Sequence, residues 1–564
     1  MSTQSGQSSR EGSVAQPRRH VVKACEGCRQ QKIKCNGESP CERCARLSLP
    51  CTVRTVARQR RKLTPTKSPA KKAGHENSEL LQMALRPVRV TNEATGKTAI
   101  YGPTSTVALL HLLASYKQDY PLPIKNYGGS VDTALTAEGF NFNGLVVEPY
   151  NAPPAPGLSL TPPLCLTTIP NQILQFFLNR YVGTAWAILP MQSPAQLGSL
   201  FSSAYTAFSH NGPPPPLYPL LLYQLAMGSL STMQGDLADI LAQESDLFIS
   251  AGVHLPDALD LQLSIIMLQY CNDTGNFDKA YSMLGHLATK IFSAGFHLEP
   301  RAPEITTLLN ILLRTESFVC IAVGRPPLLG PSIQIPNDNE GADGKFFSGL
   351  FRIITTILCT QRKPTMDFEE LWQSIWTTHA QLRSYWEEHE PIMRFAHADP
   401  FRPWNVDEAL ALNANLYEYA ILTNFKPILL YIGHKNTSRD KDSGESSQLA
   451  ISRRSPLSKI TKDDENVVTA CEHILTSAKT IIANIAEVRQ RGSVAKDLPM
   501  NSFFLETACT SLIAYGVWHE NPKAVWDSIE LGVRCMEDLQ YQKVSAQRLQ
   551  SVRTAIERSG LRQW

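Results

Sequence analysis

The stretch from Cys25 to Cys51 reads Cys25-Glu-Gly-Cys28-Arg-Gln-Gln-Lys-Ile-Lys-Cys35-Asn-Gly-Glu-Ser-Pro-Cys41-Glu-Arg-Cys44-Ala-Arg-Leu-Ser-Leu-Pro-Cys51. It places six cysteines in 27 residues, with the spacing Cys-x2-Cys-x6-Cys-x5-Cys-x2-Cys-x6-Cys. Each half has the same pattern of two cysteines two residues apart and a third after six more residues. This repeat predicts one pseudo-symmetric cysteine module.

Zinc accounts for the repeat. A structural zinc ion takes four thiolates in a tetrahedron, so two ions need eight ligand positions. Six cysteines fill eight positions only if two of them bridge both ions, and the pseudo-symmetry makes the first cysteine of each half the natural bridge. We therefore expect two zinc ions, one on Cys25, Cys28, Cys35 and Cys41 and the other on Cys41, Cys44, Cys51 and Cys25.

Three other uses of the cysteines fit less well. Three disulfides would suit a small secreted protein, but residues 1–20 carry Arg10, Arg18 and Arg19 and lack the apolar core of a signal peptide. A different two-zinc module normally uses eight ligands, and only His20 and His75 lie near. A redox Cys-x2-Cys pair has no use for the matched third cysteines.

The module resembles the fungal binuclear zinc-cluster transcription factors. The resemblance rests on the basic run that ends in Lys32-Ile-Lys34-Cys35, on the Asn36-Gly37 turn, and on Pro40 before Cys41. It implies a zinc-dependent, DNA-binding regulator of RNA polymerase II genes in the nucleus. It also implies a short helix in the major groove that reads a CGG-type triplet, and control of one metabolic or secondary-metabolite gene cluster.

The same resemblance assigns roles to the basic side chains. The lysine that reads the bases corresponds to Lys32, and its neighbour, often basic in the family, is Gln31 here. The remaining basic side chains of the module and of the segment after it would hold phosphates. They are Arg29, Lys34, Arg43, Arg58, Arg60, Arg61 and Lys62.

Charge is divided unevenly along the 564 residues. Residues 1–75 hold 17 Lys and Arg against four Glu and no Asp, while the rest holds 37 Lys and Arg against 47 Asp and Glu. A basic head on a mildly acidic body is the asymmetry of a nucleic-acid binder with a separate regulatory part. In the basic linker, Arg58 to Lys62 suits phosphate contacts or a nuclear import signal, and the plain alternative is a solvated linker.

The domain organisation follows from these shifts in composition. We expect a disordered terminus at 1–20, a zinc-cluster domain of two short helices and loops at 21–54, and a basic linker at 55–94. A large all-α domain at 95–564 should carry a disordered insert near 434–465. Periodic apolar patterns predict helices at 106–117, 171–182, 217–230, 237–250, 259–271, 279–294, 303–323, 466–489, 502–518, 523–539 and 544–559.

The helical body resembles the fungal-specific transcription factor domain, also called the middle homology region, over residues 95–345. The resemblance rests on four segments in a shared order, none of them specific alone. It implies a regulatory role for the body. The segments are Tyr101-Gly-Pro-Thr-Ser105, Phe176 to Tyr181 followed by Ile188-Leu-Pro-Met191, Tyr281 to His297, and Glu316 to Gly330 with Gly324-Arg325-Pro326-Pro327.

The sequence also gives expectations about binding partners and about enzymatic activity. We expect double-stranded DNA and transcriptional co-regulators as partners, and no membrane. The linker lacks sustained heptads, so a homodimer would have to pair without a coiled coil. Arg325 suits a turn at a helix end, where it pairs to a carboxylate or to helix-terminal carbonyls, better than a ligand site. No nucleotide-binding, metalloprotease or serine-hydrolase motif is complete, so we expect no enzyme.

Two further readings stay open. One is a zinc-dependent interaction protein with nonspecific DNA binding, and the other is a sensor whose helical body binds a metabolite. Seven cysteines outside the module stand singly in apolar surroundings and are expected to be small core residues in a reducing compartment. They are Cys165, Cys271, Cys320, Cys359, Cys471, Cys509 and Cys535.

Overall fold

The computed structural model describes residues 24–31, 33–52, 80–91, 98–115, 165–210, 213–249, 257–299, 301–330, 332–333, 342–360, 367–393, 404–442, 462–519 and 522–561. The chain forms two compact units, Met1–Lys72 and Ala73–Trp564, each of which is considered by itself. The predicted disordered terminus, Lys32 and the basic segment from Arg58 to Lys62 lie outside the described residues.

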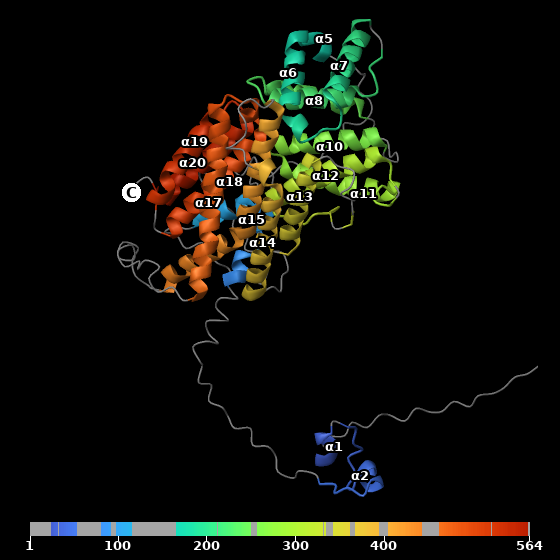
Figure 1. Cartoon of the computed structure of the whole chain (residues 1–564), viewed down its shortest axis with the longest axis vertical. Helices are drawn as coiled ribbons and strands as arrows, with labels where there is room; N and C mark the ends of the chain where they lie inside the picture. The colour runs from blue at the N-terminus through green and yellow to red at the C-terminus, as the bar shows by residue number, and fades with distance from the viewer. Residues whose placement is uncertain are drawn as a thin grey trace, which may run out of the picture. The chain divides into compact units, whose positions relative to one another are not determined.

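The first unit is small and built around the cysteines. Its two helices, α1 (Glu26–Gln30) and α2 (Glu42–Arg46), are five residues long, and the described residues between them from 33 onward form a loop without regular secondary structure (Figure 1). Helices this short are marginal in water by themselves, and the unit has little apolar surface to bury. Its buried cluster consists of Cys25, Cys28, Cys35, Cys41 and Cys44, against which Cys51 packs.

The second unit is mostly helical, as expected. Its first helices are α4 (Thr106–Ser115), α5 (Cys165–Thr168), α6 (Asn171–Gly183), α7 (Pro194–Ser209), α8 (Tyr218–Leu230), α9 (Asp236–Phe248), α10 (Ala258–Asp273), α11 (Phe277–Ala294) and α12 (Pro303–Val323). The C-terminal helices are α13 (Ala342–Thr360), α14 (Phe368–Met393), α15 (Trp404–Asp442), α17 (Lys462–Gln490), α18 (Pro499–Trp518), α19 (Lys523–Glu537) and α20 (Lys543–Ser559). Short 3-10 turns, η2 (Ala185–Ala187) and η5 (Val494–Asp497), connect some of them.

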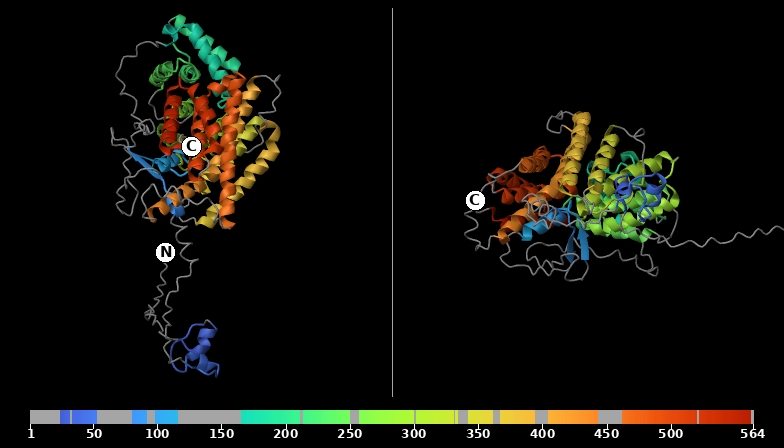
Figure 2. Two further views of the ribbon diagram at one scale, coloured as in Figure 1. Left: turned by 90° about the vertical axis from the view of Figure 1, so that its left-hand side faces the viewer. Right: turned by 90° about the horizontal axis from the view of Figure 1, so that it is seen from below.

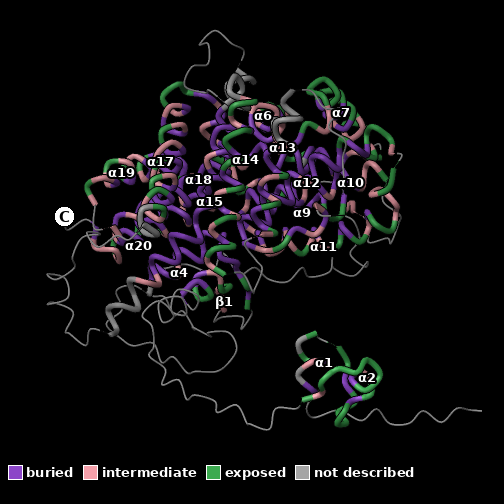
Figure 3. The backbone as a smooth tube through the Cα atoms, turned by 60° about the horizontal axis from the view of Figure 1, so that its bottom comes forward, coloured by how far each residue is buried: buried purple, intermediate pink, exposed green. Residues whose placement is uncertain are grey.

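The helices of the body pack in sequence-local groups that share one core. In Figures 1 and 2, α15, α17, α18, α19 and α20 lie side by side, and α10 to α13 form a neighbouring group. Helix α8 is buried along most of its length. Helices α12 and α18 are likewise mostly buried, whereas α11, α19 and α20 also carry exposed residues (Figure 3). The apolar residues therefore surround the central helices, whereas they lie on one side of the outer helices.

Local sequence fixes several helix ends. Helix α7 begins with a capping box, in which the Gln196 N–H donates to Ser193 Oγ at 3.3 Å and the Ser193 N–H donates to Gln196 Oε1 at 2.8 Å. Pro194 follows at the first helical position, where a missing N–H costs nothing. Helix α12 ends at Val323 and is followed by Gly324 as its C-cap, whose φ of +65° suits glycine.

Helix α12 has the length and apolar composition of a bilayer-spanning helix. It contains 21 residues, and 89% of its apolar window is buried inside the body. Such burial is the signature of the central helix of a globular core, because a lipid-facing helix would present that surface outward.

Three expectations need correction. The body is not purely helical, since β1 (Val88–Thr91) and β2 (Thr98–Tyr101) pair antiparallel with Val88 opposite Tyr101. Strand β1 therefore lies within the predicted linker 55–94. The predicted insert 434–465 is too wide, because α15 continues to Asp442 and α17 begins at Lys462. Residues 443–461 lie outside the described part.

The single cysteines mostly behave as predicted. Cys271, Cys320, Cys471, Cys509 and Cys535 are buried in the helical core. Cys359 is the exception, because it is exposed on α13. Nothing is described for the side chain of Cys165.

The core of the body also contains ionisable side chains. Lys426 on α15 is fully buried and donates from Nζ to the Thr104 carbonyl at 2.6 Å. Arg548 on α20 donates to Ser502 Oγ at 2.7 Å and lies 3.6 Å from a Glu506 carboxylate oxygen on α18. Burial lowers the pKa of Lys426 to about 7 and raises that of Glu506 to about 7. These contacts join helices from both ends of the body around a shared polar centre.

Candidate metal centre and nucleic-acid interface

Each helix of the cysteine unit begins immediately after a cysteine. Cys25 precedes α1 with φ −65° and ψ 158°, and Cys41 precedes α2 with φ −67° and ψ 151°. The two cysteines therefore share one backbone conformation, and the next cysteine of each half, Cys28 or Cys44, lies one turn into the helix. The sequence repeat is thus also a structural repeat, in which one short turn brings two sulfur atoms to the same side.

The structure brings all six predicted cysteines together. Their sulfur atoms form two groups of four that share Cys25 and Cys41, and within each group all sulfur atoms lie within 4.8 Å of one another. One group adds Cys28 and Cys35, and the other adds Cys44 and Cys51. This is the arrangement in which six thiolates can surround two ions with two bridging ligands.

Three sulfur–sulfur distances test whether zinc would fit. Cys25 Sγ lies 3.7 Å from Cys41 Sγ and 3.7 Å from Cys44 Sγ, and Cys28 Sγ lies 3.7 Å from Cys41 Sγ. With Zn–S bonds of about 2.3 Å, the edge of a regular tetrahedron is about 3.8 Å. The spacing therefore fits tetrahedral thiolate coordination and is far longer than a disulfide bond of about 2.05 Å.

The electrostatics of the sulfur cluster also favour a cation. The pKa of Cys25 is lowered, mainly by the backbone N–H of Cys28, and that of Cys41 is lowered, mainly by the backbone N–H of Cys44. Burial raises the pKa of Cys28 to about 11. The pKa of Cys44 is raised still higher, mainly by its hydrogen bond with the Cys41 thiol. Six thiolates this close repel one another, so divalent ions at their centre would relieve the repulsion.

The loop between the third and fourth cysteines is held by its own side chains. Asn36 Oδ1 accepts from the Glu42 N–H at 3.3 Å, which supplies a partner at the beginning of α2, and Asn36 Nδ2 donates to Glu38 at 3.0 Å. Gly37 has φ +83°, a conformation that glycine adopts without strain. The sequence marked Asn36-Gly37 as a turn but gave no sign that Asn36 also caps a helix.

Arg43 connects the two helices of the unit. Its Nη2 donates to Gln31 Oε1 at 2.7 Å, and its guanidinium also bonds to the Cys28 thiol, which partly offsets the rise that burial causes in the pKa of that thiol. Sequence reasoning missed this role of Gln31, because only the fold shows that the end of α1 faces α2. Arg29 and Lys34 are exposed on the surface of the unit.

Of the eight predicted DNA contacts, the structure describes Arg29, Lys34 and Arg43. Arg29 is in the last turn of α1, Lys34 is in the loop that follows, and Arg43 is in α2. The other five, Lys32, Arg58, Arg60, Arg61 and Lys62, lie outside the described residues.

Arg325 in the helical body has structural partners. Its Nη2 pairs with Asp278, its Nε donates to the Ile100 carbonyl at 2.9 Å, and its guanidinium lies 5.1 Å from the ring centre of Tyr281. Tyr101 Oη donates to the other Asp278 carboxylate oxygen at 2.7 Å. The interpretation of Arg325 as a turn residue paired to a carboxylate is confirmed.

Comparison with known proteins identifies the first unit. Residues 23–61 match the model of the fungal Zn(2)-Cys(6) binuclear cluster domain. The chain therefore carries a zinc-binding domain of this class, for which two zinc ions are the standard content. The helical body lies outside the matched segment.

Two curated proteins share similarity with the chain. "Transcription factor PDR1" of Saccharomyces cerevisiae is 50% identical over 44 residues, which are 8% of this chain and 4% of that protein. "Zinc finger protein grt1" of Schizosaccharomyces pombe is 27% identical over 96 residues, 17% of this chain and 15% of that protein. The similarity thus spans a small part of either relative. No solved structure matches the chain significantly.

Proposed function

We propose that this protein is a zinc-dependent, sequence-specific DNA-binding regulator of transcription that acts in the nucleus. The observation that carries the proposal is the pair of four-sulfur groups sharing Cys25 and Cys41 within a segment that matches the binuclear cluster model. The printed names of the two relatives, a transcription factor and a zinc finger protein, agree with it. The excess of positive charge in residues 1–75 supplies the attraction to phosphates.

Two zinc ions would serve as cross-links in this domain. One would be held by Cys25, Cys28, Cys35 and Cys41, and the other by Cys41, Cys44, Cys51 and Cys25. With so little apolar core, the unit would depend on metal binding for its folded state. Within it, Arg43 and Gln31 would hold α1 against α2 and so keep the basic segment after Cys28 in a fixed orientation.

The DNA-facing surface would be the basic run between Cys28 and Cys35. Lys32 would read a CGG-type triplet in the major groove, since lysine donates well to the O6 and N7 acceptors of guanine. Arg29, Lys34 and Arg43 would hold phosphates, as would Arg58, Arg60, Arg61 and Lys62 beyond the cluster. Contacts to phosphates position the domain, and the base contact provides its specificity.

We extend the proposal to the whole chain as follows. The body at 95–564 would be a regulatory domain of the middle homology type, contacting co-regulators and, in a homodimer, a second copy without a coiled coil. Control of one metabolic or secondary-metabolite gene cluster fits this class of regulator. The proposed role is binding and regulation, without enzymatic chemistry.

The test is binding of the full zinc-loaded chain to short duplexes by fluorescence anisotropy. One duplex contains CGG triplets and the other has the same composition in scrambled order, each titrated at several salt concentrations. We expect tighter binding to CGG, removed by a zinc chelator and restored by added zinc. Equal affinity for both duplexes would contradict sequence reading and would favour the alternative of a zinc-dependent interaction protein with nonspecific DNA binding.

Substitutions separate the two kinds of contact. Lys32→Gln should remove the preference for CGG, whereas Lys34→Gln should weaken binding to both duplexes and reduce the salt slope by about one. Lys523→Gln, at an exposed position on α19 of the helical body, is the matched control and should change neither quantity. If the Lys32→Gln chain kept its full preference for CGG, Lys32 would not be the residue that reads the bases.

A further inference from the structure

A cleft in the helical body has the properties of a small-molecule site. Its volume is about 740 Å³, within the range of about 300–1,000 Å³ typical of ligand pockets. It is bordered by α6, the turn after α8, the end of α17 with η5, and the region of α19 and the turn that follows. These segments come from both ends of the body, so the cleft exists only in the assembled fold.

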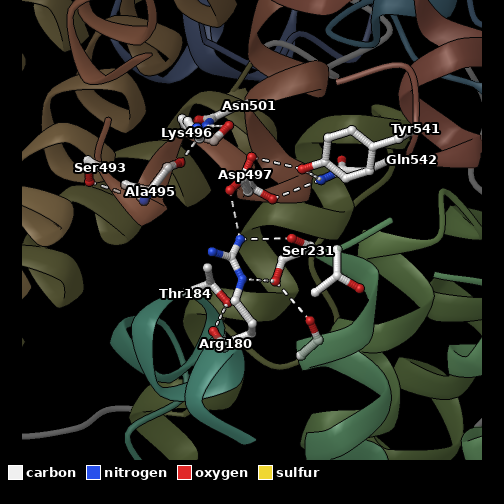
Figure 4. A network of polar contacts seen from close by, with 12 residues as sticks. Arg180, Thr184, Ser231, Ser493, Ala495, Lys496, Asp497, Asn501, Tyr541 and Gln542 are labelled. Atoms are coloured by element: carbon white, nitrogen blue, oxygen red, sulfur yellow. Dashed lines mark hydrogen bonds and ion pairs between the residues drawn. The ribbon is translucent and has the colours of Figure 1, made fainter. Parts of the chain in front are cut away.

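A polar network forms one wall of the cleft, and Asp497 is at its centre (Figure 4). One carboxylate oxygen of Asp497 accepts from Arg180 at 2.8 Å, and the other accepts from Tyr541 Oη at 2.8 Å. Arg180 also donates to the carbonyl of Ser231 at 2.8 Å and to its hydroxyl at 3.2 Å. These bonds join α6, the α8–α9 turn, η5 and the α19–α20 turn, so the wall is preorganised without a ligand.

Apolar side chains at the cleft are unusually exposed. Phe176 lies one turn before Arg180 on the same face of α6 and is 50% exposed, and Met233 in the α8–α9 turn is 87% exposed. Ala486, Leu531 and Leu539 add apolar surface. Large apolar groups that face water beside a formed pocket mark surface that an apolar ligand would cover.

Among the described residues, the carboxylates at the cleft pair with two of its three cations. Arg180 is paired with Asp497, and Arg489 is paired with Asp538. Lys496 is half-buried, and its amine has no ion-pair partner among the residues that the structure describes. The lining therefore has an excess of one positive charge. An anion at Lys496 would find an unused donor in a partly desolvated setting, where a charge-assisted hydrogen bond is strong.

We propose that this cleft binds a small amphipathic anion: an apolar body covering Phe176 and Met233, with one carboxylate at Lys496. A neutral apolar compound would leave the excess positive charge unmatched, and a small polar anion would leave the apolar rim exposed. Because the lining comes from distant segments, a bound ligand would also link α6 and α8 to η5 and α19. Binding should therefore stabilise the body in proportion to ligand concentration. This inference is independent of the DNA-binding proposal.

The test uses the full chain and 11-(dansylamino)undecanoic acid, with its methyl ester as the neutral counterpart. Dansyl fluorescence reports binding, and dodecanoate serves as an unlabelled competitor. We expect saturable binding of the acid, displacement by dodecanoate, and at least about tenfold weaker binding of the ester.

Variants locate the two parts of the ligand. Lys496→Met should weaken binding of the acid about tenfold and leave the ester unchanged, because only the acid carries the charge. Phe176→Gln should weaken both probes. The matched controls are Lys523→Met, at an exposed lysine on α19, and Ile240→Gln, at a 52% exposed position on α9, and neither should change binding. Since none of the described residues forms an ion pair with the Lys496 amine, the variant should fold normally, which the unfolding midpoint checks.

Four results would overturn the proposal. The first three are absence of saturable binding of the acid, equal affinity for acid and ester, and unchanged affinity of the acid in a folded Lys496→Met chain. A loss of binding that is equal in Ile240→Gln and Phe176→Gln would also place the probe outside the cleft.

Discussion

The backbones of Gly102 and Gly324 are in direct contact. The Gly102 N–H donates to the carbonyl of Val323 at 2.9 Å, and a Cβ built on Gly102 would lie 1.8 Å from the carbonyl oxygen of Gly324. Residue 102 follows the hairpin, and residue 324 ends α12, so the contact joins two segments more than 200 positions apart. The same junction holds Arg325 against Ile100 and Asp278.

Substitution of either glycine should therefore destabilise the body. A Cβ on Gly102 has no space, and Gly324 additionally has a positive φ, so we expect Gly102→Ala and Gly324→Ala to lower the free energy of unfolding by at least about 2 kcal/mol. Denaturant unfolding of the full chain measures the change. The control is Gly198→Ala on α7, where a Cβ meets nothing within 4 Å and helix propensity favours alanine. If Gly102→Ala were as stable as Gly198→Ala, this result would contradict the close contact between the backbones of Gly102 and Gly324.

The ion pair of Arg325 should contribute to stability through its geometry as well as its charge. The side chains of Arg325 and Asp278 are each 17% exposed, and Nε and Nη2 of the guanidinium bind different partners. Lysine keeps the charge but cannot bind both partners, so Arg325→Lys should cost about 2 kcal/mol and Arg325→Met about 3 kcal/mol. Arg383→Lys is the control, because Arg383 and its partner Glu387 are about 70% exposed. It should change stability by less than about 0.5 kcal/mol.

A double-mutant cycle tests the pairing itself. If the stabilisation comes from contact with Asp278, the combined effect of Arg325→Met and Asp278→Asn should be smaller than the sum of the single effects. Strict additivity would mean that Arg325 acts through its other neighbours, such as the Ile100 carbonyl or the ring of Tyr281.

Sequence periodicity was a good guide to many helices and a poor one to others. The segment 303–323 was predicted with the bounds that α12 has, and 171–182 differs from α6 by one residue. Among the longer helices, α7, α13, α14 and α15 were not predicted, although α13 and α14 bury apolar side chains along one side. Helix α15 contains Pro427, which argues against a continuous helix when only the sequence is considered. The strands β1 and β2 have four residues each, too few for alternation to stand out.

More of the cysteine cluster than of its surroundings could be predicted from the sequence. Ligand number and spacing alone indicate which four cysteines share an ion, because tetrahedral coordination leaves few arrangements for six thiolates. The contact between Arg43 and Gln31 could not be predicted, since it depends on how two five-residue helices face each other. The cleft beside Asp497 was equally hidden, because its lining comes from segments about 300 residues apart.

Zinc content should distinguish bridging from terminal cysteines. Cys41 belongs to both sulfur groups and Cys51 to one, so Cys41→Ser should retain less zinc than Cys51→Ser, with two ions per chain in the unaltered protein. Metal analysis of the purified full chain gives the ratio. Cys359→Ser, at the exposed cysteine of α13, is the control and should keep both ions. Equal zinc loss from Cys41→Ser and Cys51→Ser would contradict a bridging role for Cys41.

The buried Asp273 should make the stability of the body depend on pH. Burial raises its pKa to about 7, despite the hydrogen bond from Gln269 at 2.9 Å and the nearby charge of Arg548. Between about pH 4 and pH 7 the folded state therefore holds a proton that the unfolded state has released, so stability falls as pH rises through this window. Glu506 contributes with the same sign. Lys426, whose pKa is lowered to about 7, contributes the opposite slope above pH 7.

An amide at position 273 stays neutral throughout this range. Asp273→Asn should therefore lose stability less steeply than the unaltered chain between pH 4.5 and pH 7, by up to about 1.4 kcal/mol per pH unit. Guanidinium unfolding midpoints of the full chain at a series of pH values measure the two slopes. Asp527→Asn, at an exposed position on α19, is the control and should leave the slope unchanged. Parallel pH profiles for Asp273→Asn and the unaltered chain would mean that Asp273 is ionised in the folded state, with Arg548 as its effective counter-charge.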